Sequence, residues 1–399
     1  MDKQSLALIV AASLPLVASA DEVYFEATGQ VAGAAQGFLQ SPAYAGQAEG
    51  LNLSVSSEAE LYWEWNNGDD SLTFVPFARY DDFDSQRTHL DVRELLWNHL
   101  ADDYEWRVGL GKVFWGVTEF VHLVDTINQT DGVDSVTGEE KLGQPMVNLS
   151  LVRDSGIYDI YLLPGFRERT FAGQAGRFRS GLTVAEDAAR YQSSDGQSHI
   201  DYALRWSHSI DVFDMGLHWF SGTNRDPQLL QQQVNGETRL VPYYEQVDQV
   251  GLDLQATLDS WLWKLESLWR SGESGDYTAL QGGFEYTFYG VIDGVADLGV
   301  LLELGWDDRG TNAMVYAQND AFAGARLTLN DEASSEALMG VSTDLDYGGA
   351  SLMLEASRRL GDLWTVSVES QFFAPDSDDT IAYSYDRDDY IQVEFVRYF

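Results

Sequence analysis

The side chains that most often carry catalysis are few and scattered in this chain. It contains no cysteine and six histidines, so thiolate chemistry and disulfide bonds are excluded. A serine hydrolase needs a nucleophile, a histidine base and an orienting group that converge. The candidate pairs are His208 with Ser209 and His199 with Asp201. Because His208 has the outward phase of its segment beside a short turn, it is poorly placed as a base, and we predict no catalytic residues.

Metal ligands are equally sparse. Glu119 and His122 have a spacing that occurs in metal sites, but no second histidine lies nearby. We interpret this spacing as a coincidence of a loop sequence. The chain is therefore predicted to hold no metal and no cofactor, and to have no enzyme activity.

Charge is the chemistry that this chain carries in quantity. Its 64 acidic and 24 basic residues give a formal net charge of −40. Such an excess argues against nucleic acid as a partner, because the phosphates would be repelled. We interpret most of the acid as the solvated face of loops.

Two stretches gather opposite charges. Residues 115–144 are acidic, and the apolar run 120–124 within them is unusual for a segment in water. Residues 165–197 carry five of the 24 basic residues, all arginines. If the first stretch folded into a channel and faced these arginines, a transverse field would orient polar solutes. In the alternative, both stretches pack over the channel mouth and their charges merely pair. The predicted constriction residues are Glu119, Asp125, Asp131, Arg79, Arg93, Arg107, Arg167, Arg169, Arg177 and Arg179.

Alternation of apolar and polar residues defines the elements that would position these charges. Between Leu51 and Trp65 nearly every odd position is apolar and every even position except Tyr62 is polar. This period of two persists for about fifteen residues, longer than an ordinary strand in a soluble domain. A tilted strand that faces lipid on one side and water on the other needs such a length and such alternation. We interpret the segment as a strand of a transmembrane β-barrel.

The same pattern recurs along the whole chain. The predicted strands are 23–35, 49–65, 70–80, 87–100, 104–114, 145–153, 156–164, 198–208, 211–221, 243–258, 260–271, 276–289, 295–306, 320–330, 335–347, 349–360, 363–374 and 386–399. All predicted connections longer than ten residues alternate with short turns, which puts long loops at one end of a barrel and turns at the other. The fold class is all-β, a transmembrane antiparallel up-and-down barrel of about 18 strands. Sixteen strands remain an alternative, because the connection at Gly348 is very short for an outer loop.

The N-terminal twenty residues have the pattern of an export signal. Lys3 precedes an apolar segment, and Ala18-Ser19-Ala20 is a small-residue cleavage site. We predict a signal peptide at 1–20 and a barrel at 21–399. An export signal ahead of barrel strands indicates the outer membrane of a Gram-negative cell, reached through the periplasm.

Two segments resemble known outer-membrane barrels. The final strand, Tyr390 to Phe399, is similar to the C-terminal signature that the barrel-assembly machinery reads, with Phe395 and Phe399 at outward positions, although Arg397 departs from it. The segment Gly109-Leu110-Gly111-Lys112-Val113-Phe114-Trp115-Gly116, followed by the Asp/Asn-rich run 125–131, resembles porin-like barrels of unassigned substrate. This resemblance implies a diffusion pore and allows a homotrimer.

These observations predict a porin for passive diffusion of small hydrophilic solutes. A barrel of about eighteen strands is too wide for side chains to fill, and the acidic excess on its inner face predicts a preference for cations. Outer-membrane lipid and lipopolysaccharide would surround it. The alternative is a plugged or structural barrel that acts as a binding or adhesion surface through its long loops.

Overall fold

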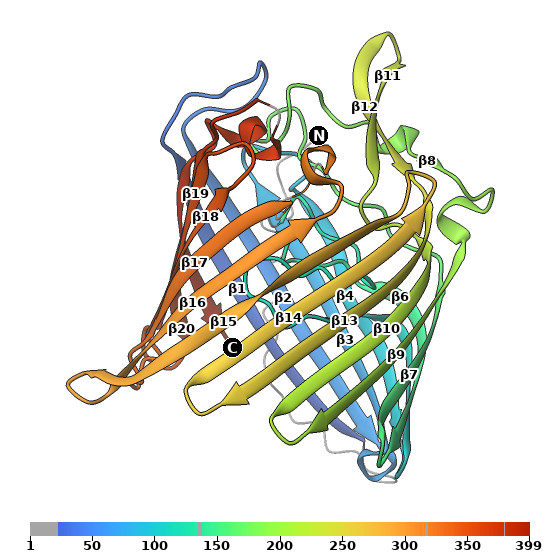
Figure 1. Ribbon diagram of the computed structural model, residues 1–399. Coiled ribbons are helices and arrows are strands. Elements are labelled where there is room, and N and C mark those ends of the chain that lie inside the picture. The colour runs from blue at the N-terminus through green and yellow to red at the C-terminus, as the bar shows by residue number, and fades with distance from the viewer. Residues whose placement is uncertain (1–22, 135–137, 314, 316–317, 379) are drawn as a thin grey trace.

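Eighteen antiparallel strands form one closed sheet in this protein. The computed structural model describes residues 23–134, 138–313, 315, 318–378 and 380–399. The first strand, β1, pairs with β2 on one side and with the last strand, β21, on the other, so the barrel closes (Figure 1). The predicted fold class is confirmed, with eighteen strands rather than sixteen. The predicted export signal at 1–20 lies outside the described residues.

The barrel strands follow the chain order around the wall. They are β1 (Tyr24–Phe38), β2 (Leu51–Trp65), β3 (Asp70–Asp81), β4 (His89–Leu100), β5 (Tyr104–Gly111), β6 (Gln144–Arg153), β7 (Gly156–Pro164), β9 (Ile200–Ile210), β10 (Phe213–Thr223), β13 (Gln246–Leu258), β14 (Trp261–Gly272), β15 (Tyr277–Ile292), β16 (Ala296–Asp307), β17 (Asn319–Thr328), β18 (Glu336–Asp344), β19 (Ala350–Arg359), β20 (Trp364–Ala374) and β21 (Tyr390–Tyr398). In the described ranges, no helix has the length and apolar character required to cross a membrane.

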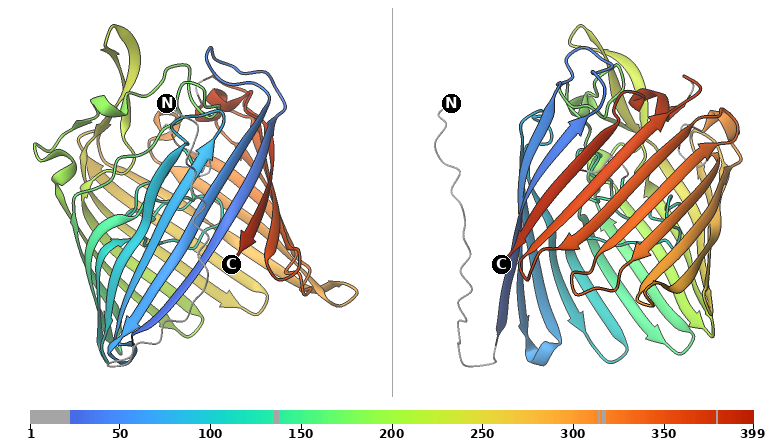
Figure 2. Two further views of the ribbon diagram at one scale, coloured as in Figure 1. Left: turned by 180° about the vertical axis from the view of Figure 1, so that it is seen from behind. Right: turned by 90° about the vertical axis from the view of Figure 1, so that its left-hand side faces the viewer.

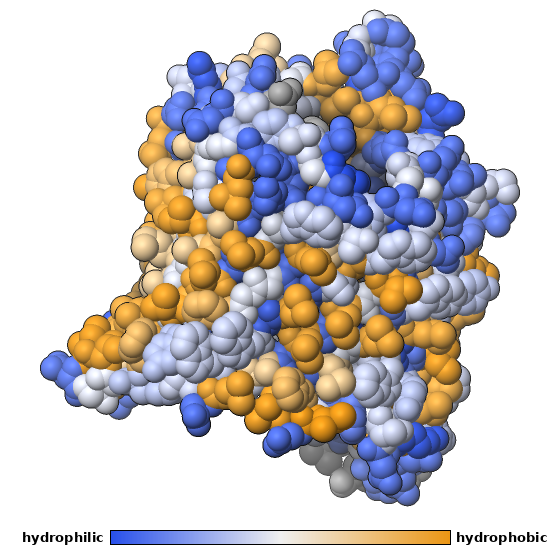
Figure 3. Space-filling view, viewed as in Figure 1, coloured by the Kyte–Doolittle hydropathy of each residue, from blue (hydrophilic) through white to orange (hydrophobic). Residues whose placement is uncertain are grey.

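Alternation determines which side chains face the interior. On β16, Val300, Leu302 and Leu304 are exposed on the outer face, while Leu301 and Glu303 between them are buried. Figure 3 shows apolar side chains spread over the strands and hydrophilic ones gathered over the long connections. The outer face is therefore the apolar face, as expected of a sheet surrounded by lipid.

Short turns join the strands at one end of the barrel. Asp211 and Asp259 each have a φ of about 55° in these turns, a left-handed conformation that Asp tolerates. Pro76 lies within β3, and the β3–β4 register shifts between Val75 and Pro76, because proline cannot donate to the ladder. The long connections all leave the barrel wall at the other end.

A second, three-stranded sheet rises from the long connections (Figure 1). It contains β8 (Arg190–Tyr191) and the hairpin of β11 (Gln228–Val234) with β12 (Glu237–Tyr244). The sequence interpretation treated 222–242 as a loop without strands, which is wrong. Asn235-Gly236 forms the hairpin turn, and this dipeptide is a strong signal for such turns.

Candidate functional site

The connection 112–143 joins β5 to β6, and its described residues, 112–134 and 138–143, cross the interior of the barrel (Figure 2). It adds Trp115, Val124 and Ile127 to a buried apolar cluster whose other members point inward from the wall. These other members are Leu96, Met146, Tyr161, Leu163, Ala203, Phe220 and Val247. A packed core thus occupies part of the interior along β4 to β13, which the alternation pattern did not predict.

Two acids of this connection contact arginines of the wall. Arg93 of β4 pairs with Asp131 at 2.6 Å and also with Asp134, and Arg79 of β3 pairs with Asp134 at 2.9 Å. Thr170 donates a hydrogen bond to Asp131 at 2.6 Å. Burial works against the charged form of Asp131, but Thr170 and Arg93 outweigh it and lower the pKa of this carboxyl below its usual range. Both acids are therefore held to the β3–β4 wall.

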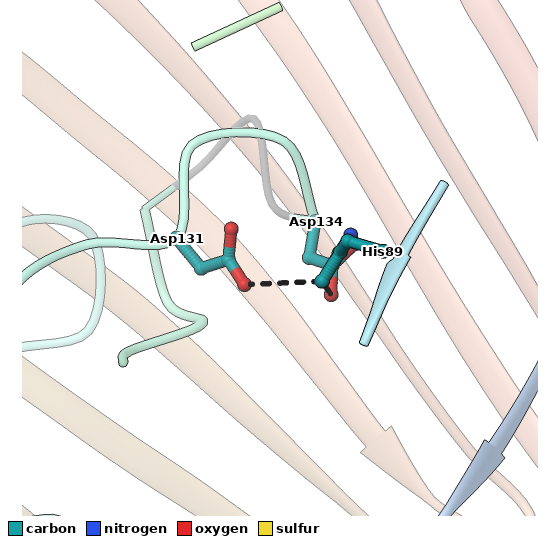
Figure 4. A group of neighbouring side chains, drawn as sticks. All are labelled: His89, Asp131 and Asp134. Carbon is teal, nitrogen blue, oxygen red and sulfur yellow. Dashed lines mark ion pairs between the residues drawn. The ribbon is translucent and has the colours of Figure 1, made fainter. Parts of the chain in front are cut away.

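His89 lies beside these two carboxylates (Figure 4). Its Nε2 is 4.0 Å from Asp131 and 3.7 Å from Asp134, and the three side chains could in principle supply ligands to a metal ion. Arg93 already brings a positive charge against both carboxylates. A divalent cation would have to displace this guanidinium, so the cluster is better suited to anchoring the connection than to binding a metal.

Glu119 reaches the opposite part of the wall. Its carboxylate pairs with Arg326 of β17 at 2.6 Å and with Lys264 of β14 at 3.4 Å. Burial opposes the charge on Glu119, but Arg326 and Lys264 outweigh this and lower the pKa of the carboxyl. Alternation along β14 and β17 places both bases on the inner face, but nothing in the pattern links them to Glu119.

The other predicted constriction residues lie in separate places. Asp125 pairs with Lys141 of the same connection at 3.2 Å, and Arg107 pairs with Glu105 of its own strand at 2.8 Å. Arg167 pairs with Asp91 of β4 at 2.6 Å.

The remaining arginines lie near the mouth. Arg169 reaches Asp226 at 3.3 Å, and Arg177 pairs with Asp388 at 2.8 Å while stacking over Phe38. Arg179 donates to backbone carbonyls of Gln174, Ser180 and Ala45. Glu119, Asp125 and Asp131 thus pair with bases of the wall or of their own connection. Arg167, Arg169 and Arg177 pair with other acids, so the two predicted groups do not pair with each other.

A cavity of about 650 Å³ remains between the connection and the wall of β1–β3 and β17–β21. Its lining extends from Glu336 and Ser357, close to the short turns, to Asp84 and Phe178 in the long connections. The five lining bases are Arg79, Arg87, Arg93, Arg177 and Arg326. The eleven lining acids are Glu58, Asp81, Asp84, Glu119, Asp134, Glu139, Glu140, Glu336, Glu355, Glu369 and Glu394. We refer to this cavity below as the acidic passage.

Comparisons with solved structures agree with this architecture. OpdQ of Pseudomonas aeruginosa aligns with a TM-score of 0.53 and 11% identity, over 94% of this chain and 98% of that one. OccK8 (OprE) of Pseudomonas aeruginosa aligns with a TM-score of 0.53 and 10% identity, over 94% and 97% of the two chains. No family model and no curated protein matches the chain. In fold, the chain is a porin-like β-barrel.

Proposed function

We propose that this chain is an outer-membrane porin, a water-filled passage for passive diffusion of small hydrophilic solutes with a preference for cations. The observation that carries the proposal is the acidic passage, which extends from the turn end of the barrel to its long connections. The apolar outer face and the fold shared with OpdQ and OccK8 support a location in the outer membrane.

The preference for cations follows from how the lining charges are partnered. Each of the five lining arginines has a carboxylate within 2.9 Å, so its field is largely neutralised nearby. Glu58, Glu355 and Glu394 have no base within ion-pair distance in the described part of the chain. Carboxylates along a passage with low-dielectric walls concentrate cations and repel anions.

The connection 112–143 acts in this proposal as the constriction loop. It contributes Glu119 and Asp134 to the lining of the passage, to which the wall contributes Glu58 and Glu355. The loop therefore narrows the passage and adds to its acidic lining. This differs from the predicted arrangement in which the acids of residues 115–144 face the arginines of residues 165–197, because Asp131 and Glu119 are paired with Arg93 and Arg326 instead.

Solute uptake into proteoliposomes tests the proposal. We expect swelling in small sugars, and faster entry of lysine than of glutamate. The double variant Glu355→Gln/Glu394→Gln should reduce this difference. Glu64→Gln is the matched control, because Glu64 is an inward glutamate outside the lining of the passage.

A binding role is the competing function. The β11–β12 hairpin projects beyond the barrel, as an adhesion surface would (Figure 1). No swelling from a correctly folded wild-type barrel would overturn the porin proposal and favour this role.

A further inference from the structure

Two inward glutamates do not line the passage. Glu266 of β14 is 0% exposed and Glu303 of β16 is 1% exposed. Alternation alone would count both among the charges that set ion selectivity. They lie instead beneath the constriction loop, and the described lining of the passage does not include them.

Glu266 binds the backbone of the loop at an arch formed by residues 117–124. Its Oε1 accepts hydrogen bonds from the amides of Val117 and Thr118 at 2.7 and 3.0 Å, and from the Thr118 hydroxyl at 2.7 Å. Its Oε2 accepts one from the Val124 amide at 3.3 Å. A carboxylate with several fixed N–H donors is a strong, charge-assisted acceptor.

A glycine allows this close approach. Gly116 has a φ of +147°, and a Cβ at this position would lie 3.0 Å from Oε1 of Glu266. Any other side chain there would be strained and would press on the carboxylate.

Glu303 holds the next two residues of the loop. Its Oε1 accepts a hydrogen bond from the Glu119 amide at 2.8 Å, and its Oε2 accepts from the Phe120 amide at 3.3 Å. Gln281 of β15 orients Oε2 by donating at 3.0 Å.

Phe120 fixes the same point of the loop by packing. Its ring stacks on Phe322 with centroids 5.3 Å apart. Gly324 and Gly340 leave the space for this ring, because a Cβ at either position would come within 3.0 Å of it. Between Val117 and Val124 the loop is thus attached to β14, β16 and β17 by two carboxylates and one aromatic contact, in addition to the ion pairs of Glu119.

We propose that Glu266 and Glu303 are positioning residues that hold the constriction loop across the barrel, and that Glu303 thereby sets the place of Glu119 in the passage. The inference rests on the proposed function only in calling the loop a constriction. The attachment itself is testable without any transport.

Thiol labelling measures the attachment directly. The chain has no cysteine, and Val124, whose amide binds Glu266, is 0% exposed. A single Val124→Cys should react slowly with a water-soluble maleimide in the folded barrel. Adding Glu266→Gln should raise the rate about tenfold. The NH2 group of glutamine donates hydrogen bonds and cannot accept them, so part of the loop N–H groups that now bind the carboxylate would lose their acceptor. Adding Glu64→Gln, which removes the same charge away from the loop, should leave the rate unchanged.

Equal rates in the Glu266→Gln and Glu64→Gln backgrounds would overturn the proposal. If Glu266→Gln does not fold, Gly116→Ala tests the same attachment, because its methyl group would displace the carboxylate. It should also raise the labelling rate, and an unchanged rate would count against the proposal.

The role of Glu303 has a separate readout in ion selectivity. Glu303→Gln should shift the reversal potential in a salt gradient, and should have no further effect in a Glu119→Gln background. Additive shifts would show that Glu303 does not act through Glu119 and would overturn this part. A wild-type barrel without current would refute the proposed function, while the labelling result would still decide the attachment.

Discussion

Arg93 is the cation shared by Asp131 and Asp134, and its removal should destabilise the barrel in a measurable way. The side chains of Arg93, Asp131 and Asp134 are 5%, 0% and 2% exposed. Removing one partner of a buried ion pair costs about 3–5 kcal/mol, because a buried charge is left without compensation. Arg79 still reaches Asp134 at 2.9 Å and Thr170 still binds Asp131, so we expect Arg93→Leu to cost about 3 kcal/mol, the lower end of this range.

This loss in the free energy of unfolding can be measured by urea unfolding of the refolded barrel in detergent at pH 7. Tryptophan fluorescence reports the transition. The matched control is Arg107→Leu, because Arg107 pairs with Glu105 but its side chain is 38% exposed. An exposed pair of this kind contributes at most about 1 kcal/mol. Asp131→Asn in the Arg93→Leu background should recover part of the loss. Equal destabilisation by the two leucine variants would refute the argument that burial of the ion pair determines its effect.

Three further outcomes are expected. Trp115→Ala should lower the free energy of unfolding by about 3–5 kcal/mol in the same urea assay, because this buried ring belongs to the interior apolar cluster; a loss below that of an outward tryptophan would contradict the packing. Arg326, with Lys264, lowers the pKa of Glu119 against the effect of burial, so Glu119 stabilises the fold above its ordinary pKa and loses this contribution as the pH falls through the lowered value. The loss in stability on acidification below about pH 4 should therefore be smaller in Glu119→Gln than in the wild type, and identical pH profiles would contradict this assignment. Zn²⁺ should bind at His89 in Arg79→Leu/Arg93→Leu but not in the wild type, as calorimetry can show, because only the double variant frees both carboxylates of their guanidinium groups; binding of equal strength to both would mean that the two arginines do not occupy the site.

The strands could be predicted from the sequence because each must alternate between an apolar outside and a polar inside. All eighteen predicted strands overlap the observed ones, and the short connection near Gly348 is the turn between β18 and β19. The hairpin at 228–244 was not predicted, because its strands are not part of the barrel wall and need not have the length of a strand that crosses a membrane.

The site could be predicted only in part. The acidic character and apolar run of residues 115–144 predicted a segment that folds into the barrel. The partners of its residues could not be found, because alternation gives the face of a side chain but not its neighbour across the barrel. Val117 and Glu266 are 149 positions apart, and no local spacing links them. For the same reason alternation alone would count Glu266 and Glu303 as channel charges, although both are buried beneath the loop.

The most direct test of the acidic passage is the reversal potential of single wild-type channels in a planar bilayer with a KCl gradient. A passage in which eleven carboxylates outnumber five paired arginines predicts a potential displaced toward the equilibrium potential of K⁺. Glu355→Gln/Glu394→Gln should move it toward zero. A wild-type potential displaced toward the equilibrium potential of Cl⁻ would contradict the account.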